Sequence, residues 1–173
     1  SQPRKNTHKG LKWPLHMVSR TKCADGSVML ILDSAAEVSV VKQEDLLVEE
    51  QTEPLHLASF MSQATACDKA GMIGATAKMF DGKDSVIMCG FGGVINHPDL
   101  KDNLASVPMM MKLGYQFWFG QYPFMVTPQG SEIPLYVKAN GYHAIRLHPM
   151  RSSNVHGLYQ VNQFSLFRRL QIN

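Results

Sequence analysis

The stretch Val28–Ala36, VMLILDSAA, decides the fold of this chain. Its first part, Val28–Leu32, is apolar without interruption, which is typical of a strand buried on both faces. The run ends at Asp33, and the small residues Ser34–Ala36 follow it. Small side chains let another backbone approach closely. Taken alone, the pattern also fits a strand that ends at a turn, where Asp33 accepts hydrogen bonds from local amides.

Short apolar segments separated by turn signals extend from this stretch in both directions. Two Asp-Gly pairs predict hairpin turns: Asp25-Gly26 between Met17–Cys23 and Ser27–Leu32, and Asp81-Gly82 between Gly74–Phe80 and Lys83–Gly90. Further strands are expected at Val38–Val41, Tyr115–Phe119, Phe124–Thr127, Leu135–Lys138, Ala144–Leu147 and Leu158–Val161.

Helical signals are fewer. Asn103–Leu113 carries apolar residues at a helical period, Pro108 suits the first turn of such a helix, and Gly114 suits its C-terminal cap. The acidic segment Lys42–Glu50 is interpreted as one helical turn or more, and Ala58–Ala70 is ambiguous between helix and strand. The chain is therefore predicted to be all-β, mostly β with one short helix, arranged as a barrel or a packed pair of sheets.

Composition limits the class of protein. The 173 residues are 45% hydrophobic, which favours one globular domain. With 17 basic and 14 acidic residues, the net charge of +3 is too small to indicate binding to nucleic acid or to a membrane surface. No apolar run approaches the roughly 20 residues of a membrane helix. Residues 1–12 are expected to be a flexible leader, and residues 13–173 the folded domain.

The cysteine pattern points to a reducing environment. Cys23, Cys67 and Cys89 are odd in number and widely spaced, so a disulfide scaffold is not expected and an intracellular, cytoplasmic location is favoured. No CxxC motif and no close Cys/His set is present, so we expect no metal and no cofactor.

Three segments carry a family resemblance. The segment Ile31–Val41, ILDSAAEVSVV, resembles the active-site loop of retroviral-type aspartic proteases and departs from it at Ala35, where that family nearly always has Gly. The segment His97–Phe119 is similar to the PxLxxNLxSVxxLxxxGY segment of copia-type LTR-retrotransposon polyproteins, and Gly157–Tyr159 resembles a short strand that follows there. The matching residues are Ile31, Leu32, Asp33, Ser34, Ala36, Glu37, Val40, Val41, Pro98, Leu100, Asn103, Leu104, Ser106, Val107, Met111, Gly114 and Tyr115.

The resemblance runs from about residue 27 to 161 and implies a copia-type protease. It implies the retropepsin-like closed β-barrel of the acid protease fold, active as a two-fold homodimer. Asp33 would be catalytic, and Ser34, Ala35 and Ala36 would form the active-site loop, with Ser34 bonding across the dimer axis. Phe80, Asp81, Gly82 and Lys83 would form the tip of a flap that closes over a polyprotein peptide substrate. Such processing would take place in an intracellular virus-like particle.

The chemistry also requires a dimer. An aspartic protease uses two carboxylates that share one proton, because like charges about 3 Å apart cannot both ionise. Asp25 and Asp81 lack the preceding apolar run, and Asp84 is followed within two residues by the bulky pair Val86-Ile87. Asp33 is therefore the single candidate, and the second carboxylate must come from another copy of the chain.

Three alternatives stay open at this level. Ala35 is compatible with a catalytically inactive, dimeric structural or binding module derived from a retroelement protease, because a methyl there could crowd the partner loop. If the position required a positive φ, alanine would also cost roughly 1 kcal/mol. A nucleic-acid-binding β domain is a weaker interpretation, since the basic residues are scattered. Residues 120–173 are either extra interface strands or the start of the next polyprotein segment.

Overall fold

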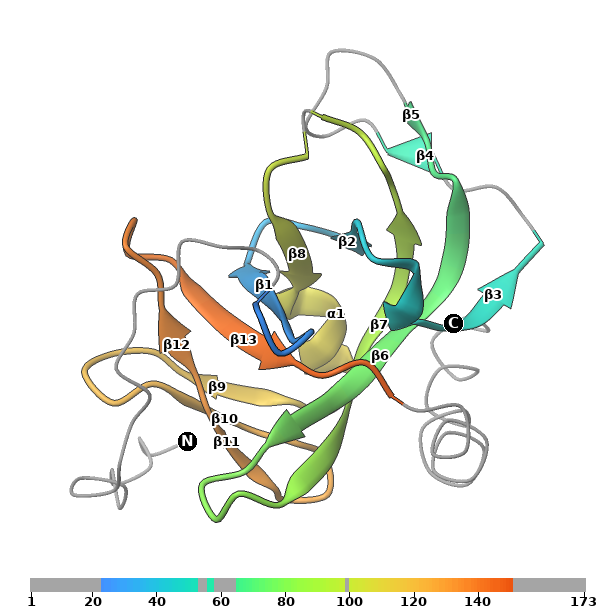
Figure 1. Ribbon diagram of the computed structural model, residues 1–173. Helices are drawn as coiled ribbons and strands as arrows, with labels where there is room; N and C mark the ends of the chain where they lie inside the picture. The colour runs from blue at the N-terminus through green and yellow to red at the C-terminus, as the bar shows by residue number, and fades with distance from the viewer. Residues whose placement is uncertain (1–22, 53–55, 58–64, 99, 151–173) are drawn as a thin grey trace.

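The computed structural model describes residues 23–52, 56–57, 65–98 and 100–150. Within them the chain is mostly β with one short α-helix, which confirms the predicted class (Figure 1). The predicted leader, the strand Met17–Cys23 up to residue 22, Leu158–Val161 and the motif Gly157–Tyr159 lie outside the described residues.

One large sheet forms the body of the molecule. Its strands are β1 (Val28–Asp33), β2 (Ser39–Val41), β3 (Leu47–Gln51), β6 (Lys69–Lys78), β7 (Asp84–Val94), β8 (Asn103–Ser106), β12 (Tyr136–Val137) and β13 (His143–Leu147). Their order across the sheet is β12-β13-β1-β8-β2-β7-β6-β3. Strand β1, built from the apolar run, therefore lies inside the sheet, as its burial requires.

Smaller elements complete the fold. A three-stranded sheet contains β9 (Gln116–Trp118), β10 (Phe124–Val126) and β11 (Glu132–Pro134), and a two-stranded sheet contains β4 (His56–Leu57) and β5 (Thr65–Ala66). The helices are the 3-10 helix η1 (Glu44–Leu46) and the α-helix α1 (Val107–Lys112).

The predicted helix is shorter than its apolar period suggested. Residues Asn103–Ser106 form strand β8, and α1 begins at Val107, with Pro108 in its first turn. Gly114 follows the C-terminal cap with φ of +102°, as the cap signal indicated. The first four residues are a strand because they pair with β1, and this tertiary pairing overrides a weak local preference.

The large sheet is not closed into a barrel. Its pairing order ends at β12 on one side and at β3 on the other within the described residues. An isolated bridge nevertheless joins Thr76 of β6 to His148, the residue after β13, through two backbone hydrogen bonds of 2.9 and 2.7 Å. The sheet therefore curls far enough for β13 to reach β6.

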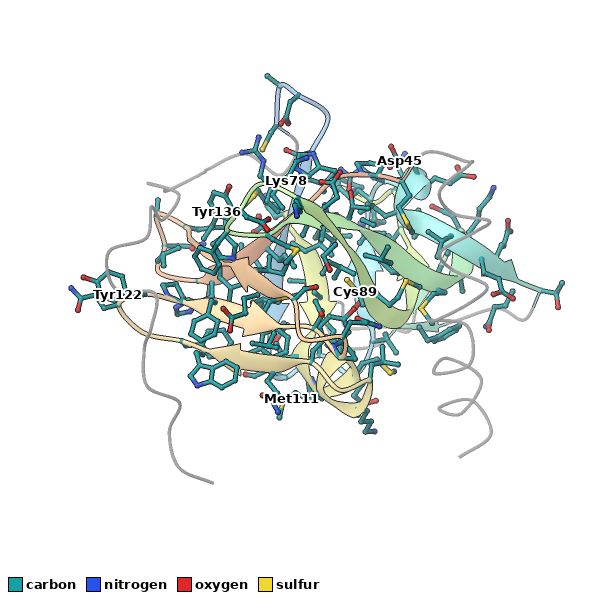
Figure 2. The ribbon with its side chains drawn as sticks, turned by 90° about the horizontal axis from the view of Figure 1, so that it is seen from below. Asp45, Lys78, Cys89, Met111, Tyr122 and Tyr136 are labelled. Carbon is teal, nitrogen blue, oxygen red and sulfur yellow. The ribbon has the colours of Figure 1, made fainter. Side chains whose placement is uncertain are left out.

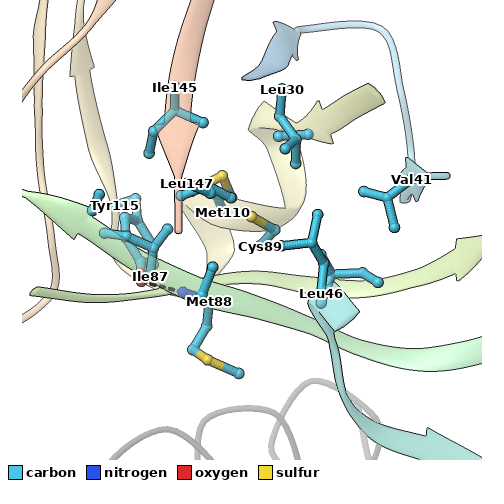
Figure 3. Packing of buried hydrophobic residues seen from close by; sticks show 14 of the residues in the cluster. Leu30, Val41, Leu46, Ile87, Met88, Cys89, Met110, Tyr115, Ile145 and Leu147 are labelled. Carbon is cyan, nitrogen blue, oxygen red and sulfur yellow. Dashed lines mark hydrogen bonds between the residues drawn. The ribbon is translucent and has the colours of Figure 1, made fainter. Parts of the chain in front are cut away.

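The core lies where α1, β6, β7 and β13 meet (Figure 3). Tyr115 is 2% exposed, and its hydroxyl accepts a hydrogen bond of 2.8 Å from the Met88 amide (Figure 3). This bond satisfies an amide next to the place where the register of β6 and β7 shifts, between Ile73 and Gly74. Burial raises the pKa of the Tyr115 phenol, so the hydroxyl stays neutral.

Gly90 lets α1 pack directly on β7. A Cβ atom built at Gly90 would lie 2.2 Å from Cγ of Met109, and its φ of +87° is one that residues with side chains rarely adopt. The three methionines of this region have different roles: Met110 is buried in the core, Met109 covers Gly90, and Met111 is 60% exposed.

Two of the strands after Gly120, β12 and β13, join the same sheet as β1. Strand β13 pairs antiparallel with β1, so that Ile145 lies opposite Leu30. The side chain of Lys138, which is 6% exposed, forms an ion pair of 2.8 Å with Asp102, just before β8. Both contacts tie the segment around residues 135–147 to the strands that surround Asp33.

Replacing a core residue of β13 should therefore destabilise the whole domain. Ile145→Ala removes a fully buried side chain and should lower the free energy of unfolding by about 2–4 kcal/mol. Val137→Ala on β12 removes a side chain that is 38% exposed and should cost less than about 1 kcal/mol. Urea unfolding followed by circular dichroism measures both. Equal, small losses would mean that β13 does not belong to the core.

Candidate active site

Asp33 lies at the end of β1, where the strand leaves the core. The first residues of β1 are buried, whereas Asp33 is half-buried and Ser34 and Ala35 are exposed. The Ala35 amide donates a hydrogen bond of 2.8 Å to Oδ1 of Asp33. The carboxylate is thus held by its own loop, in the local turn that the sequence allowed, and it sits at the surface.

Strand β8 supports this loop from one side. It lies between β1 and β2 in the sheet, parallel to β1, with Ser106 opposite Asp33. The Ser106 hydroxyl, which is fully buried, donates a hydrogen bond of 2.6 Å to the carbonyl of Ala36. The loop is therefore fixed both at Asp33 and at Ala36.

A second buried serine extends the support into β7. Ser39 begins β2, and its Oγ accepts a hydrogen bond of 2.9 Å from the Ser106 amide. The same hydroxyl donates a hydrogen bond of 3.2 Å to the Cys89 carbonyl of β7. Three strands are joined through one buried hydroxyl, which satisfies both of these backbone groups.

Asn103 performs the same task at the other end of β8. Strands β2 and β8 share a single residue pair, Val40 with Leu104. The buried Asn103 side chain accepts a hydrogen bond of 2.8 Å from the Lys42 amide and donates one of 2.7 Å to Oε1 of Gln43. Side chains at both ends of β8 therefore replace a backbone ladder that the short strands cannot form.

The roles of Ser39, Asn103 and Ser106 were not predicted. Asn103 and Ser106 stood in the sequence only as motif matches. The sequence offered one signal for these roles: two polar residues, three positions apart, interrupt a segment that is otherwise typical of a buried helix. A buried polar side chain needs a hydrogen-bond partner, so both residues were candidates for structural hydrogen bonds.

Ala35 is not strained in this loop. No residue other than glycine has a positive φ in the part of the chain that the structure describes. The cost considered for alanine at a position of positive φ is therefore absent. The Ala35 methyl is at the surface, so any crowding would involve a partner and not this chain.

The Asp81-Gly82 hairpin forms as predicted, between β6 and β7. The Met79 amide donates to the Lys83 carbonyl at 2.8 Å, the Lys83 amide donates to Oδ1 of Asp81 at 2.9 Å, and Gly82 has φ of +84°. Phe80 is half-buried, and the other turn residues are exposed. The turn is a well-formed hairpin end.

The structure does not bring this hairpin to Asp33. The strand ends next to the turn, Lys78 and Asp84, line a cavity of about 710 Å³ together with Asp25 and Gly26, which precede β1. Asp33 lies at the opposite end of β1, about 17 Å along an extended strand. Figure 1 shows the β6–β7 turn at the bottom of the view and the β1–β2 connection in its upper half. The flap role predicted for Phe80–Lys83 is therefore unsupported by their position.

The other acidic residues considered from the sequence have local partners. Asp25 forms an ion pair of 2.7 Å with Arg146 and accepts hydrogen bonds from the amide and hydroxyl of Ser27. Asp84 forms an ion pair of 2.7 Å with Lys78. In Figure 2, Lys78 lies in the upper half of the view and Met111 of α1 near the bottom. These carboxylates stabilise the start of β1 and the β6–β7 hairpin, which leaves Asp33 as the candidate.

Neither a metal site nor a membrane-spanning helix is present among the described residues. They contain no group of three or more His, Cys, Asp or Glu side chains placed to hold a metal ion. Nor does any helix there have the length and apolar character needed to cross a membrane. No family model, no curated protein and no solved structure matches this chain.

The Asp25 contacts should make stability depend on pH in the acid range. Hydrogen bonds from Ser27, followed by the charge of Arg146, lower the pKa of Asp25 from 3.8 to about 2. The ionised form therefore stabilises the fold above pH 4, and this contribution is lost as the pH falls from 4 to 2. Because Asp25 is exposed, its ionised form should contribute less than about 1 kcal/mol to the free energy of unfolding.

Asp25→Asn tests this expectation. The stability difference between the original chain and the variant should shrink as urea unfolding is repeated from pH 5 down to pH 2. A difference that stays constant over that range would show that the Asp25 carboxylate gains nothing from Ser27 and Arg146.

Proposed function

We propose that this chain is an aspartic endopeptidase of the copia retrotransposon type, which cleaves its polyprotein as a two-fold homodimer. One observation carries the proposal: Asp33 ends a buried central strand, in an exposed loop of small residues that β8 supports. A carboxylate on a rigid strand, open to a second molecule, is what a shared dyad needs.

One chain supplies only one of the two carboxylates that an aspartic protease needs. Asp33 is the candidate carboxylate, and Asp25, Asp81 and Asp84 are engaged at the start of β1 and in the β6–β7 hairpin. Ser34 and Ala35 are exposed, so a second copy can approach the loop. A two-fold axis beside the loop places the two Asp33 side chains together, with Ser34 of each chain bonding to the partner loop.

The dyad supplies general acid and base catalysis. The ionised carboxylate takes a proton from a water molecule, which attacks the peptide carbonyl, while the protonated carboxyl hydrogen-bonds the carbonyl oxygen. The two groups titrate as a pair. Activity is highest on the acid side of neutral pH, because one carboxyl must keep its proton.

The strand arrangement supports the acid protease fold. Strand β8 lies between β1 and β2, which the Asp33 loop connects, and the short helix α1 follows β8 directly. Strand β8 and helix α1 both belong to His97–Phe119, the segment that carries the copia-type resemblance. The Thr76–His148 bridge supports a sheet that approaches closure. Phe80–Lys83 has no part in the proposed site, and the processing takes place in a cytoplasmic virus-like particle.

Asp33→Asn should abolish peptide cleavage and leave the fold intact, since Asp33 is half-buried and its contact to Ala35 can be kept by the asparagine oxygen. Hydrolysis of a quenched-fluorescent peptide library at pH 5 measures activity, and the thermal midpoint measures folding. Asp81→Asn, at the exposed β6–β7 turn, is the matched control and should keep activity.

Mixing the variant with the original chain tests the shared site. If each active site uses one Asp33 from each chain, an excess of the Asp33→Asn chain should suppress the activity of a fixed amount of the original chain. Specific activity of the original chain should also fall on dilution below its dimer dissociation constant. Full activity in Asp33→Asn, or no effect of mixing, would refute the proposal.

Ala35→Gly separates an active enzyme from an inactive module. Because Ala35 is unstrained and exposed, the original chain should be active, and glycine should change its activity by less than about threefold. Both proteins are assayed on one peptide under the same conditions. An inactive original chain that glycine rescues would favour the inactive dimeric module. Two inactive proteins that are folded and dimeric would count against a protease.

A further inference from the structure

The hydroxyl of Ser106 has a fixed direction. It donates to the Ala36 carbonyl at 2.6 Å and accepts a hydrogen bond of 3.2 Å from the Met109 amide, which caps α1. A serine hydroxyl has one proton to donate, so that proton is committed to the loop. Ser106 is fully buried, so removing its hydroxyl takes away the donor that the fold aims at the Ala36 carbonyl.

The loop is short enough for this bond to control the carboxylate. Asp33 and Ala36 are three residues apart, and the Ala35 amide between them holds Oδ1 of Asp33. Ser106 itself lies opposite Asp33 across β1 and β8. Movement at the Ala36 carbonyl therefore moves the amide that orients the Asp33 carboxylate.

We propose that Ser106 is a positioning residue of the active site, which sets the orientation of Asp33 through the Ala36 carbonyl. The inference rests on the proposed function for its catalytic consequence. In a symmetric dimer both chains carry the same substitution. A change at Ser106 therefore displaces both Asp33 carboxylates of the dyad. A dyad tolerates little such error, because its two oxygens must share one proton.

A purely structural role makes a different prediction. Ser106 is also the N-cap of α1, and loss of a cap lowers stability without turning a carboxylate. Glycine replaces a serine N-cap with little loss, whereas alanine replaces it poorly. Neither residue can donate a hydrogen bond to Ala36. The two variants therefore separate capping from positioning.

The experiment compares Ser106→Ala, Ser106→Gly and Ser106→Thr with Tyr115→Phe. Tyr115→Phe is a matched control, because it removes a buried hydroxyl that bonds the Met88 amide, away from the loop. The readouts are kcat and KM on a quenched-fluorescent peptide, the pH profile, the thermal midpoint, and amide hydrogen exchange at residues 35–38.

Positioning predicts that kcat falls by about tenfold or more in both Ser106→Ala and Ser106→Gly, with KM nearly unchanged. The acid side of the pH profile should shift in both, since the dyad is displaced. Exchange at residues 35–38 should rise in both. Ser106→Thr should restore kcat and slow exchange, and Tyr115→Phe should lower only the thermal midpoint.

Three results would overturn the inference. The first is a kcat in Ser106→Gly equal to that of the original chain, which would show that Ser106 acts only as the N-cap of α1. The second is an equal loss of kcat in Tyr115→Phe, which would indicate general destabilisation. The third is unchanged exchange at residues 35–38 in Ser106→Ala. If the original chain hydrolyses no peptide, the proposed function fails, and hydrogen exchange alone then decides whether Ser106 sets the loop.

Discussion

The hydroxyls of Ser39 and Ser106 form the contact on which the centre of this structure depends. Strands β2 and β8 share only one residue pair, so the backbone alone cannot fix β8 between β1 and β2. The two serines are fully buried and connect β8, β2, β7 and the Asp33 loop through three hydrogen bonds. Since a buried polar group without a partner costs about 1–3 kcal/mol, this network restricts the four segments to one arrangement.

Local signals in the sequence were sufficient for most of the elements. The apolar run Val28–Leu32 predicted β1, Asp81-Gly82 predicted the β6–β7 hairpin, and Pro108 with Gly114 marked the two ends of α1. Each signal depends on residues that touch one another in the chain. Asn103–Ser106 was read as helix because its strand conformation comes from pairing with β1, which its own sequence does not encode.

The candidate site was predicted in part for the same reason. An acid after a buried strand can be recognised locally, and Asp33 is the last residue of β1, followed by exposed loop residues. The position of the Asp81-Gly82 turn is a property of the whole sheet. The large sheet curls so that His148 pairs with Thr76 of β6. This curl brings the strand ends of the β6–β7 hairpin, Lys78 and Asp84, close to Asp25 at the start of β1. The supporting serines, likewise, gain their roles from strands far apart in sequence.

The position of β13 shows why the support must extend beyond the loop. Strand β1 has β8 on one side and β13 on the other, so both neighbours of the Asp33 strand come from the second half of the chain. Ion pairing of Lys138 with Asp102 joins the segments that lead into these neighbours. A loop closed by Asp33 and Ala35 alone could rotate with its strand. Because β1 is paired with β8 on one side and β13 on the other, it cannot rotate about its own axis. The Ser106 hydroxyl then restricts the loop that follows β1, through its hydrogen bond to the Ala36 carbonyl.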